Sequence, residues 1–383
     1  MKKLLFLAAA ATLAACTNDE LTDQIAEPAE IAYAPAVSVP TTRSVITTEN
    51  ISEYVVNGFL TAGNKTTHYI SNNIFTKTSG EWNSTATHFW PHTGSIDFYA
   101  LSPASVASKL DFGADAPAAK RHVTIKDFEV STTTDEKTDL VYALTADRSH
   151  ENGSDLVAVP INFKHALSQV VFNVKNTNSA LIIDVDQIEI ANLASKGSYT
   201  LPQTSTTLAG GATGTWALDK KINGGKTYST FIKNVTDITP ASGTVRLTSS
   251  DEGALFLLPQ EATAWDPKND AENLNAGSYI AVHCRVWAVN GNDRVLLWPN
   301  VKDTSGTIPY HDVAIPVNIK WEEGKKYTYT LVFGEGAGYI PPTDTEGGST
   351  VDIAGEPTLK TISYNLTVED IVETTENTLY GKD

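Results

Sequence analysis

The segment that decides the fold is Lys325-Lys326-Tyr327-Thr328-Tyr329-Thr330-Leu331-Val332-Phe333, the clearest β pattern in the chain. Apolar side chains stand at every second position from Tyr327 to Phe333, and threonines occupy two of the positions between them. Because successive side chains of a strand point to opposite faces, a period of two predicts one buried face. The other face meets water, as in many antiparallel sheets. The segment therefore predicts a half-buried strand.

Similar short runs of Val, Ile, Tyr, Phe and Trp recur through the chain after Arg43, separated by turn residues. Many short strands with turns between them favour stacked sheets over a parallel α/β sheet. We therefore predict an all-β chain of two β-sandwich domains. The clearest predicted strands are residues 54–60, 95–100, 170–174, 182–190, 254–258, 279–289, 327–333 and 362–368.

A polar stretch at residues 147–155, followed by Pro160, predicts a division of the chain near residues 156–160. We expect an N-terminal domain over residues 44–157 and a C-terminal domain over residues 158–383. The formal net charge of the 383-residue chain is −17, and it becomes about −19 when Lys2 and Lys3 are removed with a signal peptide. So acidic a surface repels nucleic acid, which we do not expect as a partner.

Residues 1–15 have the composition of a secretory signal peptide. Lys2 and Lys3 precede an apolar run from Leu4 to Leu13, which is shorter than the about 20 residues that span a bilayer. Leu13-Ala14-Ala15-Cys16 resembles the lipobox of bacterial lipoproteins, which implies a lipid on the Cys16 sulfur and cleavage just before it. A soluble secreted protein with an incidental cysteine is the alternative.

Residues 16–43 are acidic and contain prolines, as expected of a tether and pro-segment. Within them, apolar residues alternate with small ones, which predicts a strand with one apolar face. Its prolines restrict that strand to a sheet edge or a strand end. The apolar positions are Ile31, Tyr33, Pro35, Val37 and Val39.

We find no active site, no metal site and no cofactor motif in the sequence. His88 and His92 are four residues apart, but the segment between them is not helical, so the spacing does not place them on one face. Asp184 and Asp186 share a strand face, yet two carboxylates fall short of the 6–8 oxygens that Ca²⁺ prefers. His165, beside apolar residues, is interpreted as a structural histidine.

Four segments together resemble the fimbrillin-like lipoproteins. The resemblance implies two transthyretin-like β-sandwich domains and a role as a stalk, tip or anchor subunit of type V pili on an outer membrane. It also implies partner pilin subunits, attachment through lipid and a possible surface ligand for adhesion. The segments are Phe89–Pro91, Phe98–Pro103, Val159–Ser168 and Trp321–Leu331.

In fimbrillins an Arg-specific protease removes the N-terminal segment, and Arg43-Ser44 resembles such a site. A solvated arginine in a linker is the alternative. Near the C-terminus, Ile362, Tyr364, Leu366 and Val368 alternate with polar residues and predict an amphipathic strand. We expect residues 31–39 to fill a sheet edge until cleavage, and this C-terminal strand of another subunit to replace them.

Two alternatives to this reading stay open. The strand at residues 362–368 can simply be the last strand of its own domain, in which case only the tail beyond it is free. The protein can also be a monomeric surface lipoprotein that binds glycans through exposed aromatic rings. Exposed, coplanar tryptophans would favour glycan binding, whereas a groove covered by an N-terminal strand would favour the pilin.

The lipobox generates the first prediction, which concerns Cys16. Metabolic labelling with a fatty-acid analogue is expected to mark the wild-type protein and to leave Cys16→Ala unmarked. One acyl chain holds only reversibly, at about 0.8 kcal/mol per buried CH₂, so firm attachment requires several chains. Equal labelling of the two proteins would contradict lipidation at this residue.

Overall fold

The computed structural model describes residues 29–37, 51–113, 123–131, 139–150, 158–208, 210–219, 226–230, 234–248, 254–271, 273, 276–299, 308–334, 338–340 and 363–370. Strands dominate these residues, which confirms the predicted all-β class. The two short 3₁₀ helices among them are η1 (Ala104–Lys109) and η5 (Pro240–Ser242). No helix in the described part of the chain is long and apolar enough to cross a membrane.

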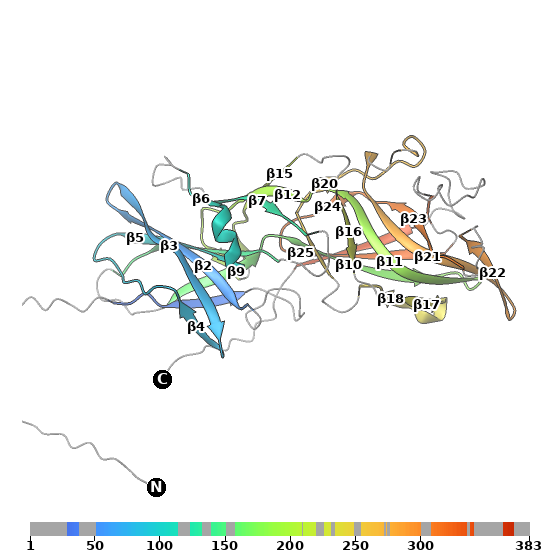
Figure 1. Cartoon of the computed structure of the whole chain (residues 1–383), viewed down its shortest axis with the longest axis horizontal. Coiled ribbons are helices and arrows are strands. Elements are labelled where there is room, and N and C mark those ends of the chain that lie inside the picture. Colours follow the sequence, from blue (N-terminus) through green and yellow to red (C-terminus); the bar gives the residue numbers. More distant parts are fainter. Residues whose placement is uncertain are drawn as a thin grey trace, which may run out of the picture.

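Two sheets form one end of the molecule, shown on the left of Figure 1. Their inner faces meet where the rings of Tyr142 and Tyr199 lie 5.2 Å apart between centroids. The larger sheet contains, in spatial order, β1 (Tyr33–Val37), β9 (Val159–His165), β8 (Val141–Arg148), β5 (Ser95–Ser102), β2 (Glu53–Ala62), β3 (Lys65–Thr78) and β4 (Glu81–Ser84). The smaller contains β15 (Thr215–Leu218), β12 (Lys196–Thr200), β7 (Thr124–Glu129) and β6 (Leu110–Asp111), and β13 (Thr206–Thr207) pairs with β14 (Gly210–Gly211).

Two further sheets form the other end, on the right of Figure 1. One contains β18 (Thr244–Arg246), β10 (Ser168–Asn176), β25 (Lys325–Phe333) and β26 (Ser363–Asp370), with β19 (Leu255–Leu257) on β10. The other contains β16 (Lys226–Thr230), β11 (Leu181–Leu193), β21 (Tyr279–Asn290) and β22 (Asp293–Trp298), with β17 (Val235–Ile238) on β11 and β23 (His311–Pro316) on β21. A short pair joins β20 (Glu261–Ala262) to β24 (Ile319–Lys320).

The segment that opened the sequence analysis forms β25, and its alternation is confirmed. Tyr329, Leu331 and Phe333 are completely buried, whereas Thr328 and Thr330 are half-buried on the other face. β25 pairs in parallel with β10 and antiparallel with β26. β25 therefore lies inside its sheet and joins the early and late parts of the C-terminal sequence.

Strand pairing also links the two halves of the sequence. β9 follows residue 158 but pairs with β1 and β8, and β12 pairs with β7. Residues 159–165 and 196–218 therefore complete sheets that contain earlier strands. The domain division near residues 156–160 remains a prediction.

A buried carboxylate connects the turn before β25 to the strands of the other end. Glu323 accepts hydrogen bonds from the hydroxyls of Tyr142 (2.7 Å) and Tyr199 (2.8 Å). Burial raises the pKa of Glu323, and the two tyrosine hydrogen bonds oppose that rise. Since the folded protein then binds this proton more tightly than the unfolded chain, its contribution to stability falls as pH rises from the ordinary glutamate range through the raised pKa.

Substitution of Glu323 provides the second prediction. Glu323→Ala removes the acceptor of two buried hydroxyls, so we expect the free energy of unfolding to fall by about 2–4 kcal/mol. Glu323→Gln keeps the shape and one acceptor, so its loss should be smaller and its stability should lack the pH dependence assigned to this carboxyl. Urea unfolding at weakly acidic and neutral pH measures both, and wild-type stability of Glu323→Ala would contradict the role of this contact.

Candidate functional site

The edge strand β1 is the feature of the N-terminal end that bears most directly on function. β1 runs parallel to β9, with Tyr33 opposite Val159 and Val37 opposite Phe163. The Val159 amide donates to the carbonyl of Ala32 at 2.8 Å. β8 pairs with β9 only at Lys164 and His165. Over residues 159–163, β1 is therefore the strand that pairs with β9 among the described residues.

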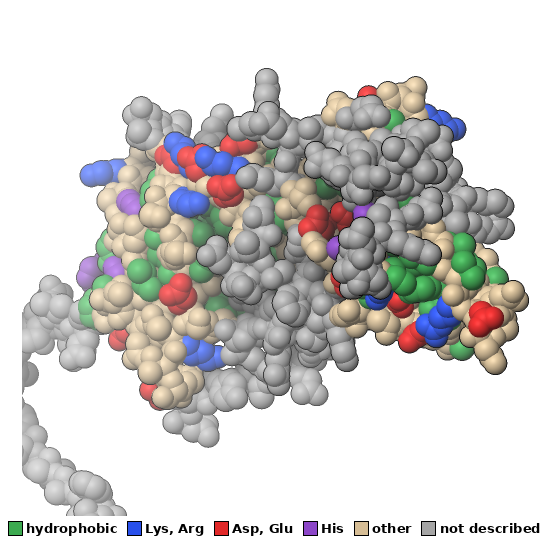
Figure 2. All heavy atoms as spheres, turned by 45° about the vertical axis from the view of Figure 1, so that its right-hand side comes forward, with side chains coloured by type: hydrophobic (Ala, Val, Ile, Leu, Met, Phe, Trp, Pro, Cys, Tyr) green, Lys and Arg blue, Asp and Glu red, His purple; other side chains and the backbone are tan. Residues whose placement is uncertain are grey.

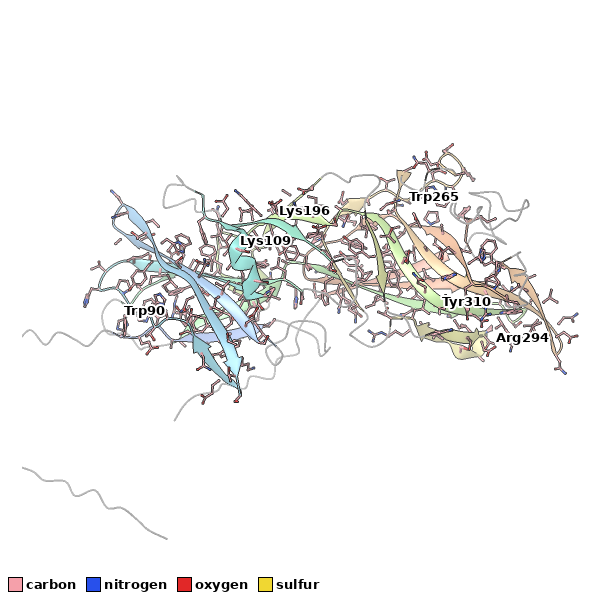
Figure 3. The ribbon with its side chains drawn as sticks, viewed as in Figure 1. Trp90, Lys109, Lys196, Trp265, Arg294 and Tyr310 are labelled. Atoms are coloured by element: carbon pink, nitrogen blue, oxygen red, sulfur yellow. The ribbon has the colours of Figure 1, made fainter. Side chains whose placement is uncertain are left out.

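Residues just before β1 are held by a different segment. The Ile31 amide donates to the carbonyl of His88, and the Trp90 amide donates to the carbonyl of Ala29, each at 2.9 Å. Trp90 lies at the same end of the molecule as β2 to β5 (Figure 3), with its ring 5.8 Å from that of Phe98. The segment 29–37 is thus fixed by main-chain hydrogen bonds to residues 88–90 and to β9.

One face of β1 enters the core, as its period of two predicts. Ile31 and Val37 are 3% and 0% exposed, whereas Ala32 and Ala34 lie at the surface. The ring of Tyr33 packs edge-on against Phe75 (4.9 Å) and Phe98 (5.8 Å). Pro35 lies in this edge strand, where a missing N–H is tolerated. Val39 lies outside the described residues.

The surface that β1 packs against, here called the β1 seat, is formed by β9 and by the side chains of Phe75 and Phe98. It is incompletely filled near Tyr33. A cavity of about 170 Å³ lies against Tyr33, Tyr54, Phe75 and Trp82. The hydroxyls of Tyr33 and Tyr54 are buried without a hydrogen-bond partner among the described residues, and burial raises the pKa of both. Packing between β1 and the residues beneath it is therefore incomplete at Tyr33.

The C-terminal strand β26 has the opposite character, because its backbone is paired while its apolar side chains are not covered. It pairs antiparallel with β25 along its whole length, and Asp370 forms an ion pair with Lys325. Leu366 and Val368 are nevertheless 41% and 49% exposed. The backbone of Tyr364 is described as part of β26, and Ile362 lies outside the described residues. β26 thus presents an exposed apolar stripe at a sheet edge.

The remaining predicted positions on the two assembly segments, Cys16, Arg43 and Ser44, lie outside the described residues. Of the other residues considered for chemistry, His92 is exposed and His165 lies in a buried contact. His165 Nδ1 lies 2.9 Å from Asp139 Oδ2, and both side chains are buried. No group of three or more metal-ligating side chains occurs among the residues that the structure describes.

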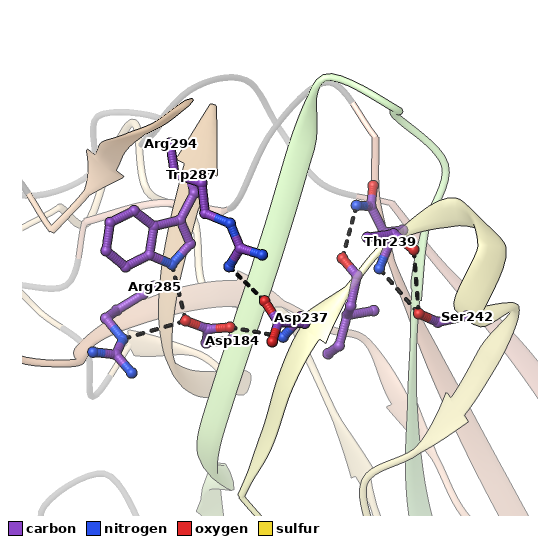
Figure 4. A network of polar contacts seen from close by, with 9 residues as sticks. Asp184, Asp237, Thr239, Ser242, Arg285, Trp287 and Arg294 are labelled. Atoms are coloured by element: carbon purple, nitrogen blue, oxygen red, sulfur yellow. Dashed lines mark hydrogen bonds and ion pairs between the residues drawn. The ribbon is translucent and has the colours of Figure 1, made fainter. Parts of the chain in front are cut away.

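Asp184 lies in a polar network that the sequence did not predict (Figure 4). It accepts hydrogen bonds from the indole of Trp287 and the amide of Asp237, each at 2.9 Å. Arg285 lies near Asp184 at 3.5 Å and stacks over the ring of Tyr310 at 3.8 Å. These aromatic rings therefore contact the protein's own polar groups.

The tryptophans bear on the alternative of glycan binding. All seven lie in described segments, and none is exposed. On the face shown in Figure 2, lysine and arginine side chains are interspersed with aspartate and glutamate side chains among the described residues. The described tryptophans therefore form no exposed aromatic platform, and the described lysines and arginines form no continuous basic patch on the face in Figure 2.

Comparison with known proteins gives one curated relative and several solved structures. A fimbrium subunit, Fim1C of Phocaeicola vulgatus, is 27% identical over 92% of this chain and 97% of its own length. Solved structures that resemble the chain include a candidate cell adhesion protein from Parabacteroides distasonis (TM-score 0.44, 11% identity, 89% of this chain and 98% of that chain). Another is the tip fimbrial protein Mfa3 from Porphyromonas gingivalis (TM-score 0.33, 10% identity, 84% and 94%). Residues 41–353 match the family described as fimbrillin-like, and the chain therefore belongs to that family.

Proposed function

We propose that this protein is a structural, non-enzymatic subunit of cell-surface fimbriae that is exported as an outer-membrane lipoprotein and supports adhesion. Membership of the fimbrillin-like family and the similarity to a fimbrium subunit support this role. In the proposed subunit, the two ends of the molecule are transthyretin-like sandwich domains. Its partners are other pilin subunits, an Arg-specific protease and the outer membrane through the lipid on Cys16.

The observation that carries the proposal is the position of β1. It lies upstream of Arg43, whereas β2 and all later strands lie downstream of it. Cleavage at Arg43-Ser44 therefore leaves β1 attached only by its hydrogen bonds and side-chain contacts. Once β1 dissociates, Val159, Ile161 and Phe163 of β9 present unpaired amides and carbonyls beside an apolar slot.

The exposed stripe of β26 supplies a suitable replacement strand. Leu366 and Val368 gain burial when they enter such a slot, at about 25 cal/mol per Å² of apolar surface. Residues 334–362 join β26 to β25, and this much chain reaches at most about 100 Å when extended at about 3.3–3.6 Å per residue. That reach allows the strand of one subunit to enter the vacated edge of another.

Glycan binding by a monomeric lipoprotein is the weaker candidate. Sugar-binding platforms present aromatic faces to solvent, whereas Trp287 and Tyr310 are engaged with Asp184 and Arg285 in this protein. The large apolar side chains that the described residues do expose are Tyr69, Phe89, Val295, Leu366 and Val368. Two of these five belong to β26, which agrees better with strand exchange.

The third prediction concerns maturation. N-terminal sequencing of protein sheared from the cell surface is expected to give Ser44 as the first residue. Arg43→Lys keeps the positive charge but lacks the arginine, so it should remain uncleaved and unpolymerised while folding normally. An uncleaved wild-type chain in assembled fimbriae would contradict the proposed release of β1.

The fourth prediction concerns the donor strand. Provided that its own domain still folds without β26, a chain that lacks residues 361–383 should be secreted but form no ladder on non-denaturing gels and no fimbriae in electron micrographs. Deletion of residues 371–383 alone is the matched control, because it retains all of β26, and it should still polymerise. Normal ladders from the longer deletion would exclude this end of the chain as the donor.

A further inference from the structure

The sequences of the two edge strands match position by position. The N-terminal segment reads Ile31-Ala32-Tyr33-Ala34-Pro35-Ala36-Val37, and the C-terminal segment reads Ile362-Ser363-Tyr364-Asn365-Leu366-Thr367-Val368. Three of the four alternate apolar positions carry the same residue, and the fourth exchanges proline for leucine. The positions between them are small or polar in both segments.

We infer that the C-terminal strand of a second copy of this chain occupies the β1 seat in one defined register, parallel to β9. In that register Tyr364 takes the place of Tyr33, Leu366 that of Pro35 and Val368 that of Val37. The inference rests on the proposed function and adds to it the identity of the partner and the pairing of each residue.

The seat itself demands this order of side chains. The position of Tyr33 favours an aromatic ring, because the ring of Tyr33 packs edge-on against those of Phe75 and Phe98. The positions of Ile31 and Val37 are buried and lined by the core. In the inferred register each receives a side chain of the same kind from the C-terminal segment.

Shifts of the register are excluded by burial and charge. A shift by one residue turns every apolar side chain to the outer face. A shift by two in one direction places Asp370 at the site of Val37, which is 0% exposed. A shift by two in the other direction places Lys360 at the site of Ile31, which is 3% exposed. Burial of an unpaired charge is strongly unfavourable, so Lys360 and Asp370 mark the two ends of the inserted segment.

The one difference between the segments favours the replacement strand. Leu366 has a larger apolar side chain than Pro35. On the outer face, Ala32 and Ala34 give way to Ser363 and Asn365, whose polar side chains suit a position in water. The C-terminal segment therefore keeps the contacts of β1 and adds apolar contact at one position.

This self-complementarity identifies the partner as another copy of the same chain. Each copy offers both the seat and the strand that fits it, so the contact is head-to-tail and repeats along a filament. The match thus assigns the protein to a repeating position in the fimbrium, where one copy follows another.

Cysteine pairs test the register directly. In β1, Ala36 lies opposite Asn162, so the inferred register places Thr367 opposite Asn162. Neighbouring strands are about 4.8 Å apart, which suits a disulfide, whereas a displacement by two residues gives about 8 Å and exceeds the limit of about 7 Å. The test pair is Asn162→Cys with Thr367→Cys, and the matched control pair is Asn162→Cys with Asn365→Cys.

In fimbriae with wild-type subunit yield, oxidation is expected to link the test pair into a ladder on denaturing gels, with little linkage of the control pair. Co-expression of two chains, one carrying Asn162→Cys and the other Thr367→Cys, should give dimers only. Preferential linkage of the control pair would overturn the register and leave strand exchange standing. Linkage within single chains would overturn the inference, and so would the absence of linkage by either pair in intact fimbriae. Polymers that form without residues 361–383 would instead overturn the proposed function itself.

Discussion

The structure depends on how the outer edge of β9 is paired. Its side chains Val159, Ile161 and Phe163 are completely buried, yet over these residues the main chain pairs with β1 alone among the described strands. A buried strand whose amides and carbonyls lose their partners is costly, because each unpaired polar group costs about 1–3 kcal/mol. The protein is therefore more stable with a strand at this edge than without one, but that strand does not have to be its own.

The strength of β1 binding suits a temporary occupant. Val37 in β1 and Ile31 just before it are buried aliphatic side chains, and such side chains contribute about 1.5–3 kcal/mol each. A covalent connection keeps the strand at an effective concentration in the millimolar range, and cleavage removes that advantage. The cavity beside Tyr33 also leaves the packing of this strand incomplete. Cleavage thus converts a stable edge into one that can exchange strands.

The sequence correctly predicted the strands that bury only one face, because apolar residues then stand at every second position. β25 and β21 are of this kind, and the prolines near β1 correctly indicated an edge. β3 was missed because most of its fourteen residues face solvent, with Ile70 and Phe75 among the few that are buried. Glu323 and Tyr199 could not be connected from the sequence, since 124 residues separate them and only tertiary pairing brings them together. The alternation of apolar and polar residues in 362–368 predicted a strand with one apolar face. It could not predict that Leu366 on this face is exposed, because exposure depends on what packs against the strand.

Hydrogen exchange at the β9 edge tests the central claim most directly. The Val159 amide, which donates to Ala32, and the amides of Ile161 and Phe163 can be followed in the uncleaved precursor, in cleaved monomer and in assembled fimbriae. The account predicts slow exchange in the precursor, fast exchange in cleaved monomer lacking residues 1–43, and slow exchange again in fimbriae. Protection that is unchanged across the three states would show that this edge neither loses nor regains a strand, and would contradict the account.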